Sequence, residues 1–185
     1  MSIRARLALT ASIVALGAAL PASATQFYVG AGLEVGNSEM SDAGSSEFDG
    51  DLTAGSLIAG VLVPIDDKWF VAAEGETTLF TSYDPDVYSG GDDIDRIWRL
   101  RARGGYDFGQ WSVYGAVGGV WVEGPIAGTA LEDSADGLTY GAGVEYGVSD
   151  KIDLRLELIH DETEFESGSY EWDNTSLRAG ATIKF

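Results

Sequence analysis

From residue 26 onward, apolar and polar residues alternate in short segments. In QFYVGAGLEVG (26–36) every second residue is apolar, and the other face carries mainly glycine and glutamate. The same period returns in seven further segments: 53–63, 69–80, 94–106, 111–122, 138–148, 152–160 and 175–185. A period of two is typical of β-strands with one apolar face, so the pattern predicts eight strands. Two of them, 53–63 and 111–122, fit less well because both faces are apolar.

The connections between these segments alternate between short and long. Residues 64–68, 107–110 and 149–151 are tight turns rich in Pro, Gly, Asp and Ser. The other connections are long, polar and glycine-containing: 37–52, 81–93, 123–137 and 161–174. Short turns on one side and long loops on the other describe an outer-membrane barrel, with turns in the periplasm and loops outside the cell.

The first 24 residues have the layout of a secretory signal peptide. Arg4 and Arg6 precede an apolar run from Leu7 to Leu20, and small residues follow up to Ala24, after which we expect cleavage. This apolar run is short for a membrane-spanning helix, and no later segment is long enough for one. We expect residues 25–185 to form one outer-membrane barrel domain.

A soluble eight-stranded barrel of the lipocalin type is the structural alternative, since it would also alternate. Aromatic residues near both strand ends favour the membrane, because such belts mark the two interfaces of a bilayer. We expect one belt at the turn end, from Phe27, Trp69, Tyr106, Trp111 and Tyr146. We expect the other toward the loop end, from Phe80, Trp98, Trp121 and Tyr140.

Three segments carry a family resemblance: FYVGAGLEVG after the signal, YGAGVEYGVSDKIDLRLEL at 140–158, and the terminal LRAGATIKF. They resemble the small eight-stranded outer-membrane proteins of Gram-negative bacteria, the OmpA-like and OmpX-like barrels. The resemblance implies that Phe185 is the C-terminal aromatic read by the barrel-assembly machinery. It also implies a surrounding of outer-membrane lipids and lipopolysaccharide. We expect no appended peptidoglycan-binding domain.

The segment RIWRLRARGGYDF (96–108) places arginines at every second position. On the lipid face, each arginine near the bilayer midplane would cost roughly 2–4 kcal/mol. We therefore expect Arg99, Arg101 and Arg103 to face the lumen. Arg96 has the other parity and lies near the extracellular edge.

Cations inside a narrow barrel need counter-charges. The pairs Glu76/Arg99 and Glu74/Arg101 fit one antiparallel register, because their residue numbers share one sum. The same reasoning pairs residues around the SDK turn and across the closing strands. The expected lumen charge network is Glu34, Glu74, Glu76, Arg99, Arg101, Arg103, Glu145, Arg155, Glu157 and Arg178. In this set we expect Glu145 to pair with Arg155, Glu157 with Arg178, and Glu34 with Arg178. The network is interpreted as a plug, and a selectivity lining or gate is the alternative.

Composition excludes several function classes. The net charge of −19, which becomes −21 with nine basic and 30 acidic residues after signal removal, argues against nucleic-acid binding. Without cysteine, neither disulfides nor thiolate metal sites can form. The four long connections, with Asp95, hold twenty acids and no Lys or Arg. We interpret them as a solvated acidic crown, with loose Ca²⁺ or Mg²⁺ binding as the alternative, densest at 84–93.

His160 is the only histidine, and the question is whether it is catalytic. Lipid A deacylases are barrels of this size with a Ser/His/Glu group, and Ser167 and Ser169 follow nearby. No motif surrounds these serines, and outward parity at the interface accounts for the histidine. We expect no catalytic residues, cofactor or metal. The expected role is structural or a cell-surface interaction, with a low-conductance pore as the first alternative and an adhesin or lipid A-modifying enzyme behind it.

Overall fold

The computed structural model describes residues 25–42, 47–85, 96–125, 132–165 and 170–185. These residues form eight strands: β1 (Gln26–Asp42), β2 (Glu47–Pro64), β3 (Trp69–Pro85), β4 (Arg96–Asp107), β5 (Trp111–Pro125), β6 (Glu132–Gly147), β7 (Ile152–Phe165) and β8 (Tyr170–Lys184). The expected signal peptide lies outside the described residues. Among the described residues, no helix is long and apolar enough to cross a membrane.

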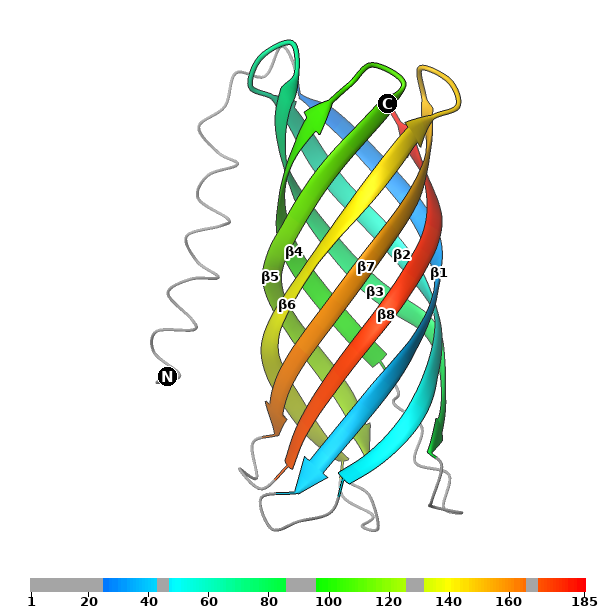
Figure 1. The fold of residues 1–185 in the computed structure, drawn as a ribbon, viewed down its shortest axis with the longest axis vertical. Helices are drawn as coiled ribbons and strands as arrows, with labels where there is room; N and C mark the ends of the chain where they lie inside the picture. The colour runs from blue at the N-terminus through cyan, green and yellow to red at the C-terminus, as the bar shows by residue number, and fades with distance from the viewer. Residues whose placement is uncertain (1–24, 43–46, 86–95, 126–131, 166–169) are drawn as a thin grey trace.

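The strands close into one antiparallel barrel, in which each strand pairs with its neighbours in sequence and β8 pairs with β1 (Figure 1). This confirms the fold class predicted from the alternation. The tight turns after β2, β4 and β6 lie at the same end as the C-terminus. We call this the turn end and the opposite one the loop end. Gly109, at φ 100°, adopts in the β4–β5 turn a backbone conformation that suits glycine.

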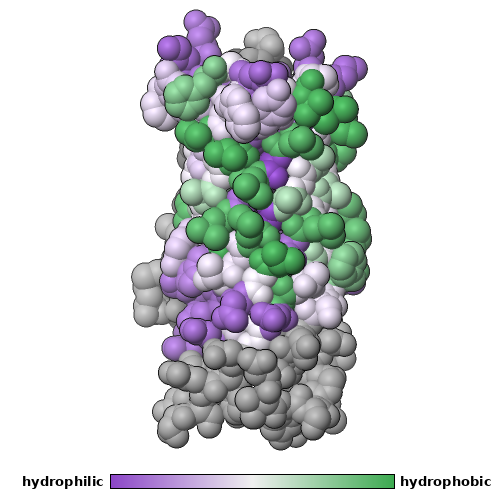
Figure 2. All heavy atoms as spheres, turned by 45° about the vertical axis from the view of Figure 1, so that its right-hand side comes forward, coloured by the Kyte–Doolittle hydropathy of each residue, from purple (hydrophilic) through white to green (hydrophobic). Residues whose placement is uncertain are grey.

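The outer wall carries an apolar band with polar residues beyond it (Figure 2). Large exposed side chains supply it, including Leu33, Leu57, Val117, Leu156 and Leu177. An exposed apolar surface of this extent is stable only when lipid covers it.

Both aromatic belts lie on this wall. At the turn end, the Trp69 ring packs edge-on against Tyr106, with centroids 4.9 Å apart, and Trp111 packs on Tyr146 at 4.6 Å. At the loop end, Phe80, Trp98, Trp121 and Tyr140 are exposed. Pairs of interfacial aromatics at both ends match the boundaries of a membrane-spanning barrel.

The strands extend well beyond their expected ends at the loop side. The segments 37–42 and 47–52 were expected to be loop, yet they pair with each other as parts of β1 and β2. The segments 132–137 and 161–165 are likewise paired strand. The expected loop bounds were therefore wrong. The reason is physical: beyond the lipid band the outer face meets water and is polar, while the inner face stays buried, so backbone pairing continues although the outer apolar alternation ends.

A β-bulge interrupts the alternation in β3. Gly55 pairs with Phe80 and Ser56 with Thr78, which leaves Leu79 as the extra residue. Thr78 consequently points inward and is buried, whereas both Leu79 and Phe80 are exposed outside. The bulge places the Phe80 ring over Gly55, where a side chain would collide with it.

Candidate functional site: the charge network in the lumen

The arginine row of β4 points into the barrel. Arg99, Arg101 and Arg103 are at most 2% exposed, while Trp98 on the other face is 42% exposed. An isolated buried guanidinium is very costly, so the position of these residues depends on the acids around them. These acids come from four other strands and form three layers along the barrel.

The layer nearest the loop end centres on Arg99. Its guanidinium binds the carboxylates of Glu34 at 2.9 Å, Glu76 at 2.6 Å and Asp161 at 2.6 Å. Further donors hold two of these acids in place, since the Ser176 hydroxyl donates to Glu34 and the Asn174 amide to Asp161. Arg99 therefore joins strands β1, β3 and β7 across the lumen.

The middle layer contains two arginines from opposite sides of the barrel. Arg101 binds Glu74 at 2.7 Å and Glu157 at 2.8 Å. Arg178 binds Glu157 at 2.5 Å and also pairs with Glu76. Because each glutamate is shared between arginines, the layers form one continuous network rather than separate pairs.

The layer nearest the turn end combines charges with two tyrosines. Glu145 accepts from Arg103 at 2.8 Å and from Arg155 at 2.9 Å. The Arg103 guanidinium lies 3.9 Å from the centroid of the Tyr114 ring, a cation–π contact. The Tyr28 hydroxyl donates to Glu74 at 2.9 Å. These rings fit because Gly60 and Gly143, on the adjacent inner positions, leave them space.

The structure places all ten residues named for the network inside the lumen. The predicted registers 76/99, 74/101, 145/155 and 157/178 occur as cross-strand pairs, each with an ion pair. Glu34 is the exception. It stands opposite Arg178 on the neighbouring strand, but the structure brings its carboxylate to Arg99 instead. Backbone register fixes neighbouring positions, whereas a long guanidinium can reach across a narrow lumen.

Asp161 is a member of the network that sequence reasoning assigned to the acidic crown. Its side chain is fully buried and binds Arg99. The alternation along β7 could have identified Asp161 as a lumen residue, because Arg155, Glu157 and Asp161 lie on the same face of the strand. It was missed because the strand was expected to end at residue 160.

Above the charges, at the loop end, an apolar layer lies inside the lumen. Its members are at most 3% exposed and comprise Leu52, Ile97, Val120, Val122, Ala135 and Trp172. The weak alternation in 53–63 and 111–122 arises because apolar residues are also buried on the inner faces of β2 and β5, namely Ala54, Ile58, Val120 and Val122. Apolar residues at inward-facing positions of these strands were the sequence signal that could have predicted buried apolar residues in the lumen.

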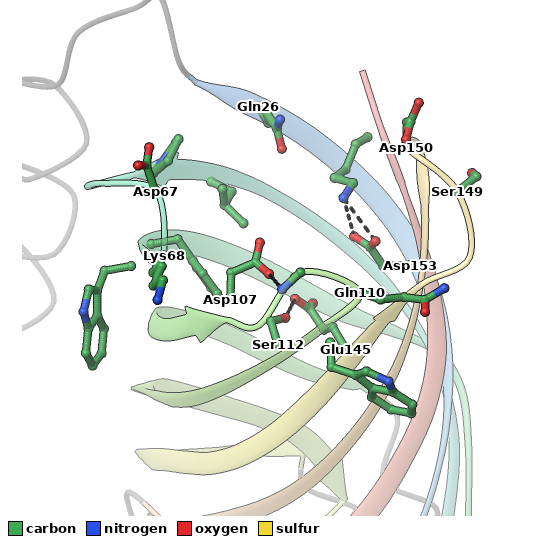
Figure 3. Close-up of a pocket in the computed structure, with 18 of the residues that line it drawn as sticks. Gln26, Asp67, Lys68, Asp107, Gln110, Ser112, Glu145, Ser149, Asp150 and Asp153 are labelled. Atoms are coloured by element: carbon green, nitrogen blue, oxygen red, sulfur yellow. Dashed lines mark hydrogen bonds and ion pairs between the residues drawn. The ribbon is translucent and has the colours of Figure 1, made fainter.

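At the turn end the lumen opens into a vestibule of about 550 Å³ (Figure 3). Its walls carry Asp107, Asp150 and Asp153, and Lys184 binds Asp153 at 3.0 Å. Glu145 also lines it, so the vestibule reaches the charge network. At its rim, the backbone N–H groups of Trp69 and Lys68 donate to Asp66 and lower the pKa of that carboxyl group.

His160 lies on the outer wall near the loop end. Its Nδ1 is 2.7 Å from the Thr175 hydroxyl, and its ring packs against Tyr140. Glu162 stands 3.5 Å from Nε2, beyond the hydrogen-bond distance that an orienting acid needs. Ser167 and Ser169 lie outside the described residues.

Two further predictions concern the C-terminal Phe185 and the acidic stretch 84–93. Phe185 is 74% exposed, stacks on Phe27 with centroids 6.5 Å apart, and donates its backbone N–H to the Phe27 carbonyl. Most of the acidic stretch 84–93 lies outside the described residues. Within the described ranges, no three His, Asp or Glu side chains gather to hold a metal ion.

Comparison with known proteins identifies the class. The family model of the outer membrane protein beta-barrel domain matches residues 7–185. A 22 kDa outer membrane protein of Rhizobium leguminosarum bv. viciae is 32% identical over 113 residues, which are 54% of this chain and 53% of that protein. The chain thus matches about half the length of this curated relative.

Two solved structures share the fold. The attachment invasion locus protein Ail of Yersinia pestis superposes with a TM-score of 0.53 at 14% identity, covering 86% of this chain and 98% of that one. Neisserial surface protein A gives 0.52 at 17% identity, covering 86% and 97%. The closed eight-stranded barrel with its lipid-facing band is thus that of an integral outer-membrane protein. The chain belongs to the outer-membrane β-barrel domain family and is located in the outer membrane.

Proposed function

We propose that this protein is a closed, non-catalytic barrel with a structural or cell-surface interaction role in the outer membrane. The observation that carries the proposal is the set of buried side chains inside the lumen. Five arginines and six acids occupy its middle, and the apolar layer around Trp172 occupies its loop end. Eight strands enclose only enough space for side chains, so a filled interior leaves no room for a water column.

An ion crossing this lumen would meet two barriers. It would have to displace guanidinium groups that each bind two or more carboxylates, such as Arg99 and Arg101. It would then enter the apolar layer, whose side chains are mainly aliphatic and replace little of its hydration shell. Both barriers support a protein that does not conduct.

The surface role is supported by the loop-end strand extensions. They carry exposed acids beyond the lipid band, including Glu39, Asp51, Glu123, Glu162 and Glu171. Paired strands hold these side chains at fixed spacing outside the membrane, as a recognition surface requires. An attachment role, as in the name of the Yersinia pestis protein, is one form that such a surface could take.

A low-conductance pore is the second candidate, and the vestibule favours it. This water-accessible space of about 550 Å³ extends from the turn end as far as Glu145. A pore would require the remaining layers to rearrange.

Planar-bilayer recording of the refolded wild-type protein separates the two candidates. We expect no steady current, because the ionic and apolar layers close the lumen in series. A heat-dependent shift in gel mobility on the same preparation would verify that the barrel is folded. Steady, ion-selective current from verified barrels would contradict the proposal and support the pore.

A further inference from the structure

The outer wall of the barrel bears an apolar groove that the lumen does not explain. It has a volume of about 1160 Å³ and is bordered by strands β1 to β6 and β8. Small residues lie along it, among them Ala31, Ala59, Gly75 and Ala181, with larger side chains to either side. At Gly75 a Cβ atom would meet no other atom within 4 Å, so the groove is open at this point.

The groove runs obliquely across the barrel wall, from the turn end toward the loop end. Its residues on neighbouring strands are cross-strand partners, such as Ala59 and Gly75. A row of such partners is inclined to the barrel axis, because the strands themselves tilt by roughly 35–45°. Ile183 borders the groove and lies close to the turn end, where it pairs with Ile152 at the start of β7. Trp98 and Trp121 border it at the loop-end belt. A flexible acyl chain can follow this oblique path from the level of the headgroups into the bilayer.

A single cation stands where the groove reaches the loop end. Arg96 is exposed two residues beyond Trp98, and its guanidinium lies 5.8 Å from the centroid of the Trp98 ring. Among the described residues it is the one lysine or arginine side chain outside the barrel at this end. Lys68, Lys151 and Lys184 lie at the turn end, and the other arginines are buried. Glu123, the cross-strand partner of Arg96, borders the groove on the other side.

We propose that this groove binds one acyl chain of a phosphorylated glycolipid of the outer leaflet, a lipid A-type molecule, with its phosphate at Arg96. The groove supplies an apolar channel for the chain, and Trp98 and Trp121 flank it at the height of the headgroup. Arg96 supplies the positive charge in a rim that is otherwise acidic. A phosphate therefore has one favourable position, directly above the apolar channel.

The shape of the wall favours a lipid over a second copy of the chain. Two barrels are convex, so they touch along a narrow line and cannot reach the floor of a groove at Ala59 and Gly75. A flexible acyl chain can follow that floor and bury its methylenes there.

Native mass spectrometry tests the proposal on the refolded protein in detergent, titrated with bis-phosphorylated lipid A. We expect the wild type to bind one lipid A in preference to phosphatidylglycerol. Gly75→Leu fills the groove without a steric clash and should weaken binding about tenfold, the effect of displacing about two methylene groups. Arg96→Gln should also weaken it about tenfold, through loss of a charge-assisted hydrogen bond.

Gly104→Leu is the matched control. Gly104 is an exposed glycine of β4 with equally open space around its Cβ position, and it does not border the groove. The affinity of the Gly104→Leu variant for lipid A should equal that of the wild type. Ala59→Leu, on the strand beside Gly75, is a second groove-filling variant in case Gly75→Leu does not fold.

Three results would overturn the proposal. Equal lipid A affinity in the groove-filling variants and Gly104→Leu would place the lipid elsewhere. Equal binding of phosphatidylglycerol would remove the commitment to a phosphorylated glycolipid. A wild-type dimer lost in Gly75→Leu, with lipid A binding unchanged, would assign the groove to a second copy.

Discussion

Arg99→Ala is expected to lower the free energy of unfolding by about 3–5 kcal/mol, because it leaves buried charges without their partner. Glu34, Glu76 and Asp161 all bind this guanidinium, and all are nearly or fully inaccessible to solvent. The loss is a large part of a typical stability of about 5–15 kcal/mol. Urea titration of the refolded barrel in lipid vesicles, followed by tryptophan fluorescence, measures it.

Arg96→Ala is the matched control for Arg99→Ala, since it removes the same type of side chain from the same strand. Arg96 is exposed on the outer face, so its removal should change stability by no more than about 0.5 kcal/mol. Similar losses in the two variants would indicate that Arg99 is not held in a dry, charge-paired interior.

Trp172→Ala is expected to lower the free energy of unfolding by a comparable amount, about 3–5 kcal/mol, by a different mechanism. Trp172 is the largest buried side chain of the apolar layer, and its removal leaves a cavity among Leu52, Ile97 and Val122. The same urea titration measures the loss.

Trp121→Ala serves as the comparison for Trp172→Ala. Trp121 is 39% exposed on the outer wall, so its removal opens no internal cavity and should cost clearly less. If the two variants lose the same unfolding free energy, Trp172 is not packed in a buried apolar layer at the loop end.

Much of the fold was predictable because one physical constraint acts on every strand. Lipid outside and a crowded lumen inside impose a period of two, and this period places Arg99, Arg101 and Arg103 inward. Constant register then pairs Glu76 with Arg99 and Glu74 with Arg101.

What the sequence did not predict lies where that constraint weakens. Beyond the lipid band the outer face is polar, and the inner face mixes polar residues such as Asp161 with apolar ones, so the extended strand ends and Asp161 were missed. The apolar layer around Trp172 gave lumen positions the same composition as lipid-facing ones. The contact between Glu34 and Arg99 depends on side-chain reach across the lumen, which sequence spacing does not encode.

A double-mutant cycle on Arg101 and Glu74 tests the central claim, a buried and interconnected charge network, most directly. The two side chains are cross-strand partners 2.7 Å apart, and both are nearly inaccessible to solvent. We expect Arg101→Ala to lower resistance to urea, and we expect Glu74→Ala in the same chain to add less than its own separate cost. The relief should be partial, because Glu74 also binds Arg103 and Arg155. Strictly additive losses would contradict the network.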